Sequence, residues 1–218
     1  MGKLTRVIID TDPGVDDALA ILLALRSPEL EVVAITTVCG NVPVEQATRN
    51  LFRVLSLVRP PPSLLIGQGA SRPLLRPLET AVHFHGTDGL GELDGVRNAD
   101  GSLRYQQPTL PRTLPTAQGV WNECLHRYPH ELTLITLGPL TNLATALARE
   151  PSPIRTLRAV ISMGGALAVR DSSTHRRDHR SGDTISGGRD GHRAGLCGGN
   201  RSGGALSAAR SAGRGRRH

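Results

Sequence analysis

The 218-residue sequence has few aromatic residues, one lysine and few cysteines. Aromatic side chains make up 2% of the chain, and the three cysteines, Cys39, Cys124 and Cys197, lie far apart. This spacing excludes a disulfide framework and a zinc motif, and it is typical of a protein from a reducing compartment. We therefore expect a cytoplasmic protein.

Long apolar runs are also missing from the sequence. No run reaches the length that a membrane-spanning helix needs, and the short apolar stretch near the start leads directly into carboxylates. That pattern does not fit a signal peptide. We expect neither a leader sequence nor a membrane partner.

Charge divides the chain after Ala166. Residues 167–218 contain 11 arginines, no lysine and 4 aspartates, whereas residues 1–166 contain 15 basic and 15 acidic side chains, so the formal charge of +7 lies in the last segment. That segment is rich in Gly and Ser and cannot bury enough apolar surface to offset its conformational entropy. We expect a folded domain over 1–166 and a disordered tail over 167–218. The abrupt change favours a tail translated out of frame over a natural basic extension.

Hydrophobic patterning in residues 1–166 predicts alternating strands and helices. The expected elements are strands over 4–10, 31–38, 132–136 and 157–163, and helices over 16–26, 44–58, 116–127 and 140–150. Such alternation is typical of an α/β protein with an open, mostly parallel, Rossmann-like sheet. Residues 59–112 are rich in Pro and Gly and are expected to form a long functional loop region with some short elements.

Four aspartates, Asp10, Asp12, Asp16 and Asp17, follow the first expected strand in the string IIDTDPGVDDA. Ligand sites of open parallel sheets lie beyond the carboxyl ends of strands. Clustered carboxylates repel one another unless a cation is present, and oxygen ligands favour calcium or magnesium. Alternatively, Asp16 and Asp17 simply occupy the first turn of a helix, where negative charge is favourable. The other two aspartates and the Pro-Gly turn favour a metal site.

Five motifs follow one another in residues 4–166: DTDPGVDDALAILLAL, TTVCGN, HFHGTDGLG, TLGPLTNLA and ISMGGA. Their order and spacing resemble those of the calcium-dependent, inosine/uridine-preferring nucleoside hydrolases. The resemblance implies calcium as cofactor, a ribonucleoside as small-molecule partner, and hydrolysis of the N-glycosidic bond to ribose and free base. It also implies a homodimer or homotetramer that serves nucleoside catabolism and purine salvage.

The resemblance assigns roles to eight positions. Asp12 resembles the metal-bound carboxylate that takes the proton of the attacking water, and Asp17 resembles a bidentate calcium ligand. The backbone carbonyl of Leu137 matches a further calcium ligand, and Asp10 matches a carboxylate that positions the loop. The substrate-binding positions are Asp16 for the ribose hydroxyls, Asn41 for the ribose, His85 near the sugar and leaving group, and Met163 in the ribose pocket.

The sequence after Ala166 departs from the family pattern. An Asn/Glu/Asn segment that grips the ribose, and a late His-Asp pair that supplies a leaving-group acid and another calcium ligand, have no counterpart in residues 167–218. The resemblance therefore covers roughly the N-terminal half of a typical member. We expect impaired hydrolysis or a catalytically inactive remnant, and an exposed sheet edge or apolar face.

Two other functions are compatible with parts of the sequence. Phosphatases of the haloacid-dehalogenase type also begin with a strand that ends in DxD, but they require Thr or Val where Gly14 stands and a downstream lysine, whereas Lys3 is the single lysine. Non-specific nucleic-acid binding through the arginines of residues 167–218 requires only charge. Because no aromatic residues are interleaved there to stack on bases, no specific nucleic-acid partner is expected.

Overall fold

The structure, a computed structural model, describes residues 4–105 and 107–164. Predictions for the arginine-rich segment 167–218, including its disorder, its reading frame and its binding of nucleic acid, lie outside these residues. The domain predicted over 1–166 is thus described for nearly its whole length.

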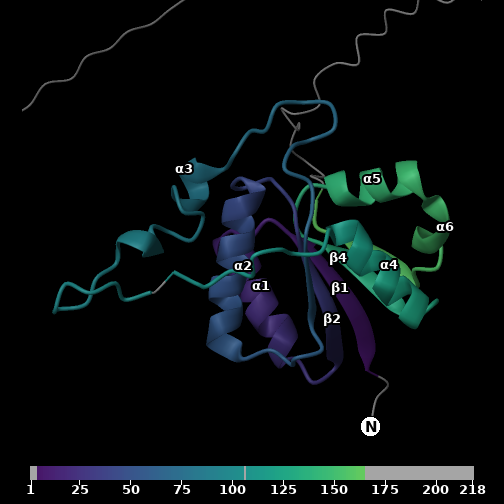
Figure 1. The fold of residues 1–218 in the computed structure, drawn as a ribbon, viewed down its shortest axis with the longest axis horizontal. Helices are drawn as coiled ribbons and strands as arrows, with labels where there is room; N and C mark the ends of the chain where they lie inside the picture. Colours follow the sequence, from purple (N-terminus) through teal and green to yellow (C-terminus); the bar gives the residue numbers. More distant parts are fainter. Residues whose placement is uncertain (1–3, 106, 165–218) are drawn as a thin grey trace, which may run out of the picture. The chain divides into compact units, whose positions relative to one another are not determined.

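Five parallel strands form one sheet in the order β3-β2-β1-β4-β5 (Figure 1). The strands are β1 (Thr5–Thr11), β2 (Leu30–Thr37), β3 (Leu65–Gln68), β4 (Leu132–Thr136) and β5 (Ala159–Ser162). The predicted α/β fold with an open parallel sheet is confirmed. The strand β3 was not predicted, because it is four residues long and lies in the Pro- and Gly-rich region. Its pairing with β2 defines it.

Helices cover both faces of the sheet (Figure 1). One face packs against α1 (Val15–Arg26) and α2 (Val44–Val58), and the other packs against α4 (Ala117–Arg127), α5 (Thr141–Arg149) and the short α6 (Pro151–Ile154). Two further short helices, α3 (Val82–His85) and η1 (Leu93–Gly95), lie in the region predicted to be a long loop. The helices predicted from periodicity are confirmed to within about one residue at each end.

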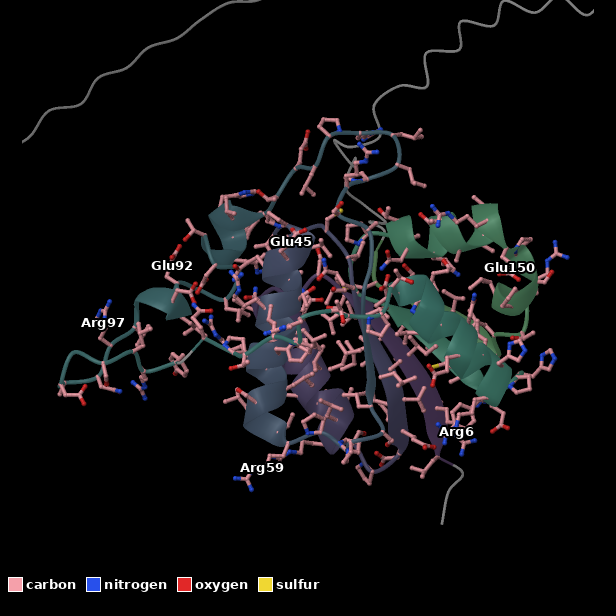
Figure 2. The ribbon with its side chains drawn as sticks, in the orientation of Figure 1. Arg6, Glu45, Arg59, Glu92, Arg97 and Glu150 are labelled. Atoms are coloured by element: carbon pink, nitrogen blue, oxygen red, sulfur yellow. The ribbon has the colours of Figure 1, made fainter. Side chains whose placement is uncertain are left out.

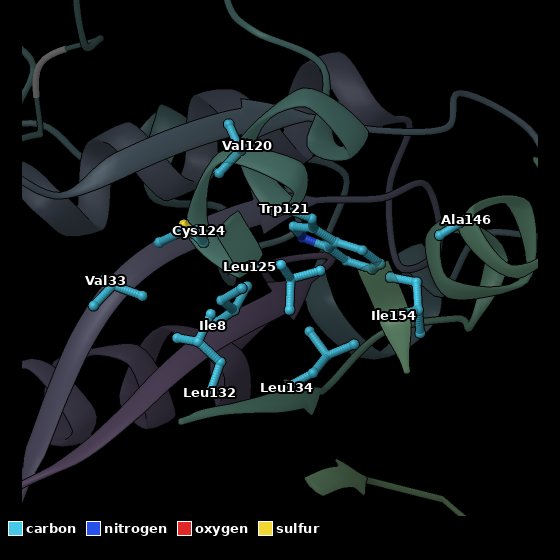
Figure 3. Close-up of a cluster of buried hydrophobic side chains, with 11 residues drawn as sticks. Ile8, Val33, Val120, Trp121, Cys124, Leu125, Leu132, Leu134, Ala146 and Ile154 are labelled. Atoms are coloured by element: carbon cyan, nitrogen blue, oxygen red, sulfur yellow. The ribbon is translucent and has the colours of Figure 1, made fainter. Parts of the chain in front are cut away.

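The alternation of side chains along β1 divides the core into two clusters. Val7 and Ile9 pack toward α1 and α2, whereas Ile8 packs toward α4. Trp121 on α4 is buried in the second cluster, as Figure 3 shows, and its indole N–H donates to the hydroxyl of Thr36 on β2 over 3.0 Å. A parallel sheet buried on both faces requires the continuous apolar runs that the sequence has.

Part of the apolar surface stays exposed. The strand β5 lies at one edge of the sheet, and all four of its residues are exposed. Leu19 and Leu23 on α1 are 64% and 73% exposed. The expectation of an exposed sheet edge is therefore met at β5. Within the described ranges, no helix is long and apolar enough to cross a membrane.

Candidate functional site

The carboxyl edge of the sheet borders a cavity of about 430 Å³. Segments that follow β1, β2, β4 and β5 meet there, because the carboxyl ends of parallel strands lie at the same edge. Six of the eight predicted site residues line the cavity: Asp12, Asp16, Asn41, His85, Leu137 and Met163. The other two, Asp10 and Asp17, are buried and do not line it.

Asp12 is held in a narrow space between two glycines. A Cβ atom on Gly40 would lie 1.9 Å from its Oδ2 atom, and one on Gly138 would lie 2.5 Å from its Oδ1 atom. The backbone N–H of Asn41 donates to Oδ2 over 2.6 Å. Burial raises the pKa of Asp12 to about 7; the Asn41 N–H opposes this effect, and the nearby charges of Asp17 and Asp10 add to it.

Asp17 occupies the first turn of α1. One carboxylate oxygen accepts from the hydroxyl of Thr11 over 2.7 Å, and the other accepts from the backbone N–H of Gly14 over 3.0 Å. The side chain is 3% exposed. Asp17 therefore stabilises the first turn of the helix, which is the alternative that the sequence left open for it. It also lies close enough to Asp12 for its charge to raise the pKa of Asp12.

Asp10 supports the site from within the sheet. Its Oδ1 atom accepts from the hydroxyl of Thr36 over 2.6 Å and from the side-chain amide of Asn142 over 2.8 Å, whereas its buried Oδ2 atom has no partner. Burial raises the pKa of Asp10 to about 7, and these two hydrogen bonds oppose the shift. The backbone carbonyl of Asp10 also accepts from Leu137 N–H over 2.8 Å, which fixes the turn after β4.

Asn41 joins the two turns that carry the carboxylates. Its side-chain amide donates to the backbone carbonyl of Asp12 over 3.2 Å and to Asp17 Oδ2 over 3.3 Å. Gly14 makes room for this amide, since a Cβ there would lie 2.9 Å from Asn41 Nδ2. The residue predicted to bind ribose thus also holds the carboxylates in place.

His85 and Asp16 face each other at the rim. The Nδ1 atom of His85 accepts from the backbone N–H of Val15 over 3.3 Å and lies 3.9 Å from an Asp16 carboxylate oxygen. Because Nδ1 accepts a hydrogen bond, the ring proton of the neutral imidazole is on Nε2. The Asp16 side chain is 66% exposed and free to meet a ligand.

Two residues that line the cavity, Glu79 and Ala81, lie outside all five sequence motifs and were missed. They precede α3, and the N–H of Ala81 donates to the carbonyl of Asn41 over 2.9 Å. The sequence signalled only a functional loop, because local composition does not specify which loop residue meets a distant turn. Two polar supports were also missed, Thr36 and Asn142, although they lie within the motifs TTVCGN and TLGPLTNLA.

The site has an excess of negative charge. In the described part of the chain, no Lys or Arg forms an ion pair with Asp10, Asp12 or Asp17. Arg6 pairs with Glu31 and Glu131 near the amino ends of the strands, where Figure 2 labels it, and does not line the cavity. Buried carboxylates that lie close together with no basic side chain beside them favour a bound cation or a proton.

The oxygen donors of the site meet only part of what a metal ion requires. Over residues 4–105 and 107–164, no group of three or more His, Cys, Asp or Glu side chains is placed to hold a metal ion. Two carboxylates, Asp12 and Asp17, and the backbone carbonyl that follows β4 at Leu137 lie at the same edge. All of these donors are oxygen atoms, which suits a hard divalent cation.

Comparison with known proteins decides the family. The sequence model of the inosine-uridine preferring nucleoside hydrolase family matches residues 7–186. The chain belongs to this family. It is 37% identical over 167 residues to uridine nucleosidase 1 of Arabidopsis thaliana, covering 76% of this chain and 46% of that protein. It is 39% identical over 160 residues to the non-specific ribonucleoside hydrolase RihC of Klebsiella pneumoniae, covering 73% and 49%.

Solved nucleoside hydrolases share the fold. A plant enzyme, PpNRh1, superposes with a TM-score of 0.60 at 37% identity, over 74% of this chain and 48% of that one. The purine-preferring ribonucleoside hydrolase of Gardnerella vaginalis superposes with a TM-score of 0.63 at 31% identity, over 76% and 50%. The chain spans about half the length of the curated nucleoside hydrolases that it matches.

Proposed function

We propose that the chain binds a ribonucleoside in the cavity and hydrolyses its N-glycosidic bond to ribose and free base. The placement of Asp12 carries this proposal. Its buried carboxyl faces the cavity, accepts the N–H of Asn41 over 2.6 Å, and is enclosed by Gly40 and Gly138. A carboxylate held in one position beside the cavity is suited to take a proton from a water molecule bound there. Membership in the nucleoside hydrolase family supports the same reaction.

Calcium is the cofactor in this proposal. Asp12, Asp17 and the carbonyl of Leu137 would hold it, and Asp10 would support the turn after β4. When bound, the ion supplies a positive charge that lowers the pKa of a water molecule and orients it. The oxygen donors and the unpaired negative charge of the site support this choice.

The other cavity residues bind and orient the substrate in this proposal. Asp16 accepts hydrogen bonds from the ribose hydroxyls, and its 66% exposed side chain is available for them. His85 donates through Nε2 to the sugar or the leaving base. As the base departs, positive charge develops on the ribosyl group, and the carboxylate of Asp12 stabilises it. Asn41 and Met163 border the ribose from the turns after β2 and β5.

Location and assembly belong to the same proposal. The two cysteines that the structure describes, Cys39 and Cys124, are unpaired and buried, which supports a reducing cytoplasm. We place the reaction in nucleoside catabolism and purine salvage, in a homodimer or homotetramer. The partner is a small ribonucleoside, not a specific nucleic acid or a membrane.

Release of reducing ribose from inosine and uridine by the purified 218-residue chain tests the reaction. We expect turnover with calcium that a chelator removes and that Asp12→Asn abolishes. Asp100→Asn is the control, because Asp100 is exposed in a loop away from the cavity. A chain that binds ribose without turnover would instead be a catalytically inactive member, which is the second candidate for a chain that spans only about half the length of its relatives.

A further inference from the structure

Asn50 bridges two segments of the site that are distant in the sequence. It lies on α2 and is completely buried. Its side-chain Nδ2 atom donates to the carbonyl of Pro13 over 3.0 Å and to the carbonyl of Asp88 over 2.9 Å. Pro13 directly follows Asp12, and Asp88 lies three residues after His85. One amide therefore ties the turn of Asp12 to the segment of His85.

Both polar atoms of the Asn50 side-chain amide have hydrogen-bond partners. Both N–H groups have acceptors, and the Oδ1 atom accepts from the side-chain amide of Gln46 over 2.9 Å, which fixes the orientation of the group. Gly89 has a φ of +78°, and a Cβ there would lie 2.8 Å from Asn50 Nδ2. The glycine therefore allows the segment after His85 to approach α2 this closely.

Asp88 organises the segment that Asn50 holds. Its Oδ1 atom accepts from the backbone N–H groups of Leu90 and Glu92 over 2.8 and 2.9 Å, and its Oδ2 atom accepts from Asp94 N–H over 3.0 Å. The N–H of Gly91 donates to the carbonyl of His85 over 2.7 Å. A shift of the bridge at Asp88 would therefore be transmitted to the backbone of His85.

The position of the His85 imidazole depends on how its segment lies against the turn of Asp12. The His85 ring packs against Gly14, where a Cβ would lie 2.9 Å from Nδ1, and it accepts the N–H of Val15 over 3.3 Å. We propose that Asn50 is a positioning residue that fixes His85 in one orientation and one tautomer over the turn of Asp12. The consequence for substrate binding rests on the proposed function, whereas the effect on His85 does not.

The test compares three variants of the full 218-residue chain. Asn50→Leu removes both bridging hydrogen bonds. Gln46→Ala, at a half-buried position, removes the donor that orients the Asn50 amide and the 3.3 Å hydrogen bond from Gln46 to the Asp88 carbonyl. Leu51→Ala is the control, because it creates a void in the core beside Asn50 but leaves the bridge intact. The readouts are the ring nitrogen resonances of His85, which report the tautomer, and the hydrogen exchange of the Leu90 and Glu92 amides.

We expect Asn50→Leu to give a mixture of His85 tautomers and at least about tenfold faster exchange at both amides. Gln46→Ala should change both readouts in the same direction by less. Leu51→Ala should lower the thermal midpoint without changing either. The proposal is wrong if Gln46→Ala and the folded fraction of Asn50→Leu keep the single tautomer and the slow exchange.

A ligand titration separates this result from the proposed function. Ribose with calcium chloride should shift the His85 resonances of the wild-type chain and shift them less in Asn50→Leu. Wild-type resonances that do not respond to ribose or inosine would contradict the proposed function. The comparison of tautomers and exchange rates among the variants without ligand would still decide the role of Asn50.

Discussion

Asn41 holds Asp12 by both its side chain and its backbone. The Asn41 N–H donates to Oδ2 of Asp12 over 2.6 Å, and the Asn41 side-chain amide donates to the Asp12 carbonyl over 3.2 Å. The turns after β1 and β2 are thereby fixed to each other at the point where the proposed general base enters the cavity.

Replacing Asn41 with alanine should reduce both stability and turnover. The variant loses the bonds to the Asp12 carbonyl and to Asp17, so we expect a loss of about 1–2 kcal/mol in the free energy of unfolding. Ribose release should fall about 10- to 100-fold, since the proposed ligands lose their orientation. Urea unfolding and the ribose assay measure these effects. Asn98→Ala removes an exposed amide and is the control; equal effects of both variants would contradict the prediction.

Gly40→Ala should displace Asp12. The added Cβ would lie 1.9 Å from Oδ2 of Asp12 and 2.7 Å from the Cδ atom of Pro139, so either the carboxylate or the backbone must shift. We expect a loss of turnover of about 100-fold or more, since a small misplacement of a catalytic group has effects of this size. Gly95→Ala is the matched control, because nothing lies within 4 Å of its added Cβ. Similar activity in both variants would show that the space around Asp12 is not limiting.

Stability of the metal-free protein should fall as the pH rises from about 4 to about 7. The pKa of Asp10 is raised from 3.8 to about 7 by burial, and that of Asp12 is raised likewise. In this window the folded state binds more protons than the unfolded state, so the free energy of unfolding decreases with pH. Urea unfolding at pH 5 and pH 8 in chelator measures the change. Asp10→Asn, which keeps the acceptor for Thr36, should show a smaller decrease; an equal decrease would exclude Asp10 as its source.

Calcium should stabilise the chain through Asp12 and Asp17. A ligand that binds only the folded state at a hundred times its Kd adds about 2.7 kcal/mol to the free energy of unfolding. We therefore expect calcium chloride to raise the thermal midpoint of the wild-type chain and chelator to reverse the effect. Asp12→Asn should lose this response, and Asp100→Asn should keep it. A rise of the same size in Asp12→Asn would place any calcium elsewhere.

Much of the site could be located from the sequence because local patterns specify it. The strand that ends at Asp10 and the helix that begins near Asp16 are each encoded by neighbouring residues, and the carboxyl edge of a parallel sheet then brings the motifs together. Residues without such a local signal were missed. Asn50 lies in an ordinary amphipathic helix, and its role depends on the carbonyls of Pro13 and Asp88.

The sequence alone determined the alternation of strands and helices, the neutral charge balance of residues 1–166, and the four aspartates after the first strand. Those features depend on hydrophobic period and on neighbours along the chain. Only the tertiary structure decided that Gly40 and Gly138 enclose Asp12, that Asp10 has an unpartnered buried oxygen, and that β3 completes the sheet. Burial and contact between distant segments set these properties, because desolvation and close approach exist only once the chain has folded.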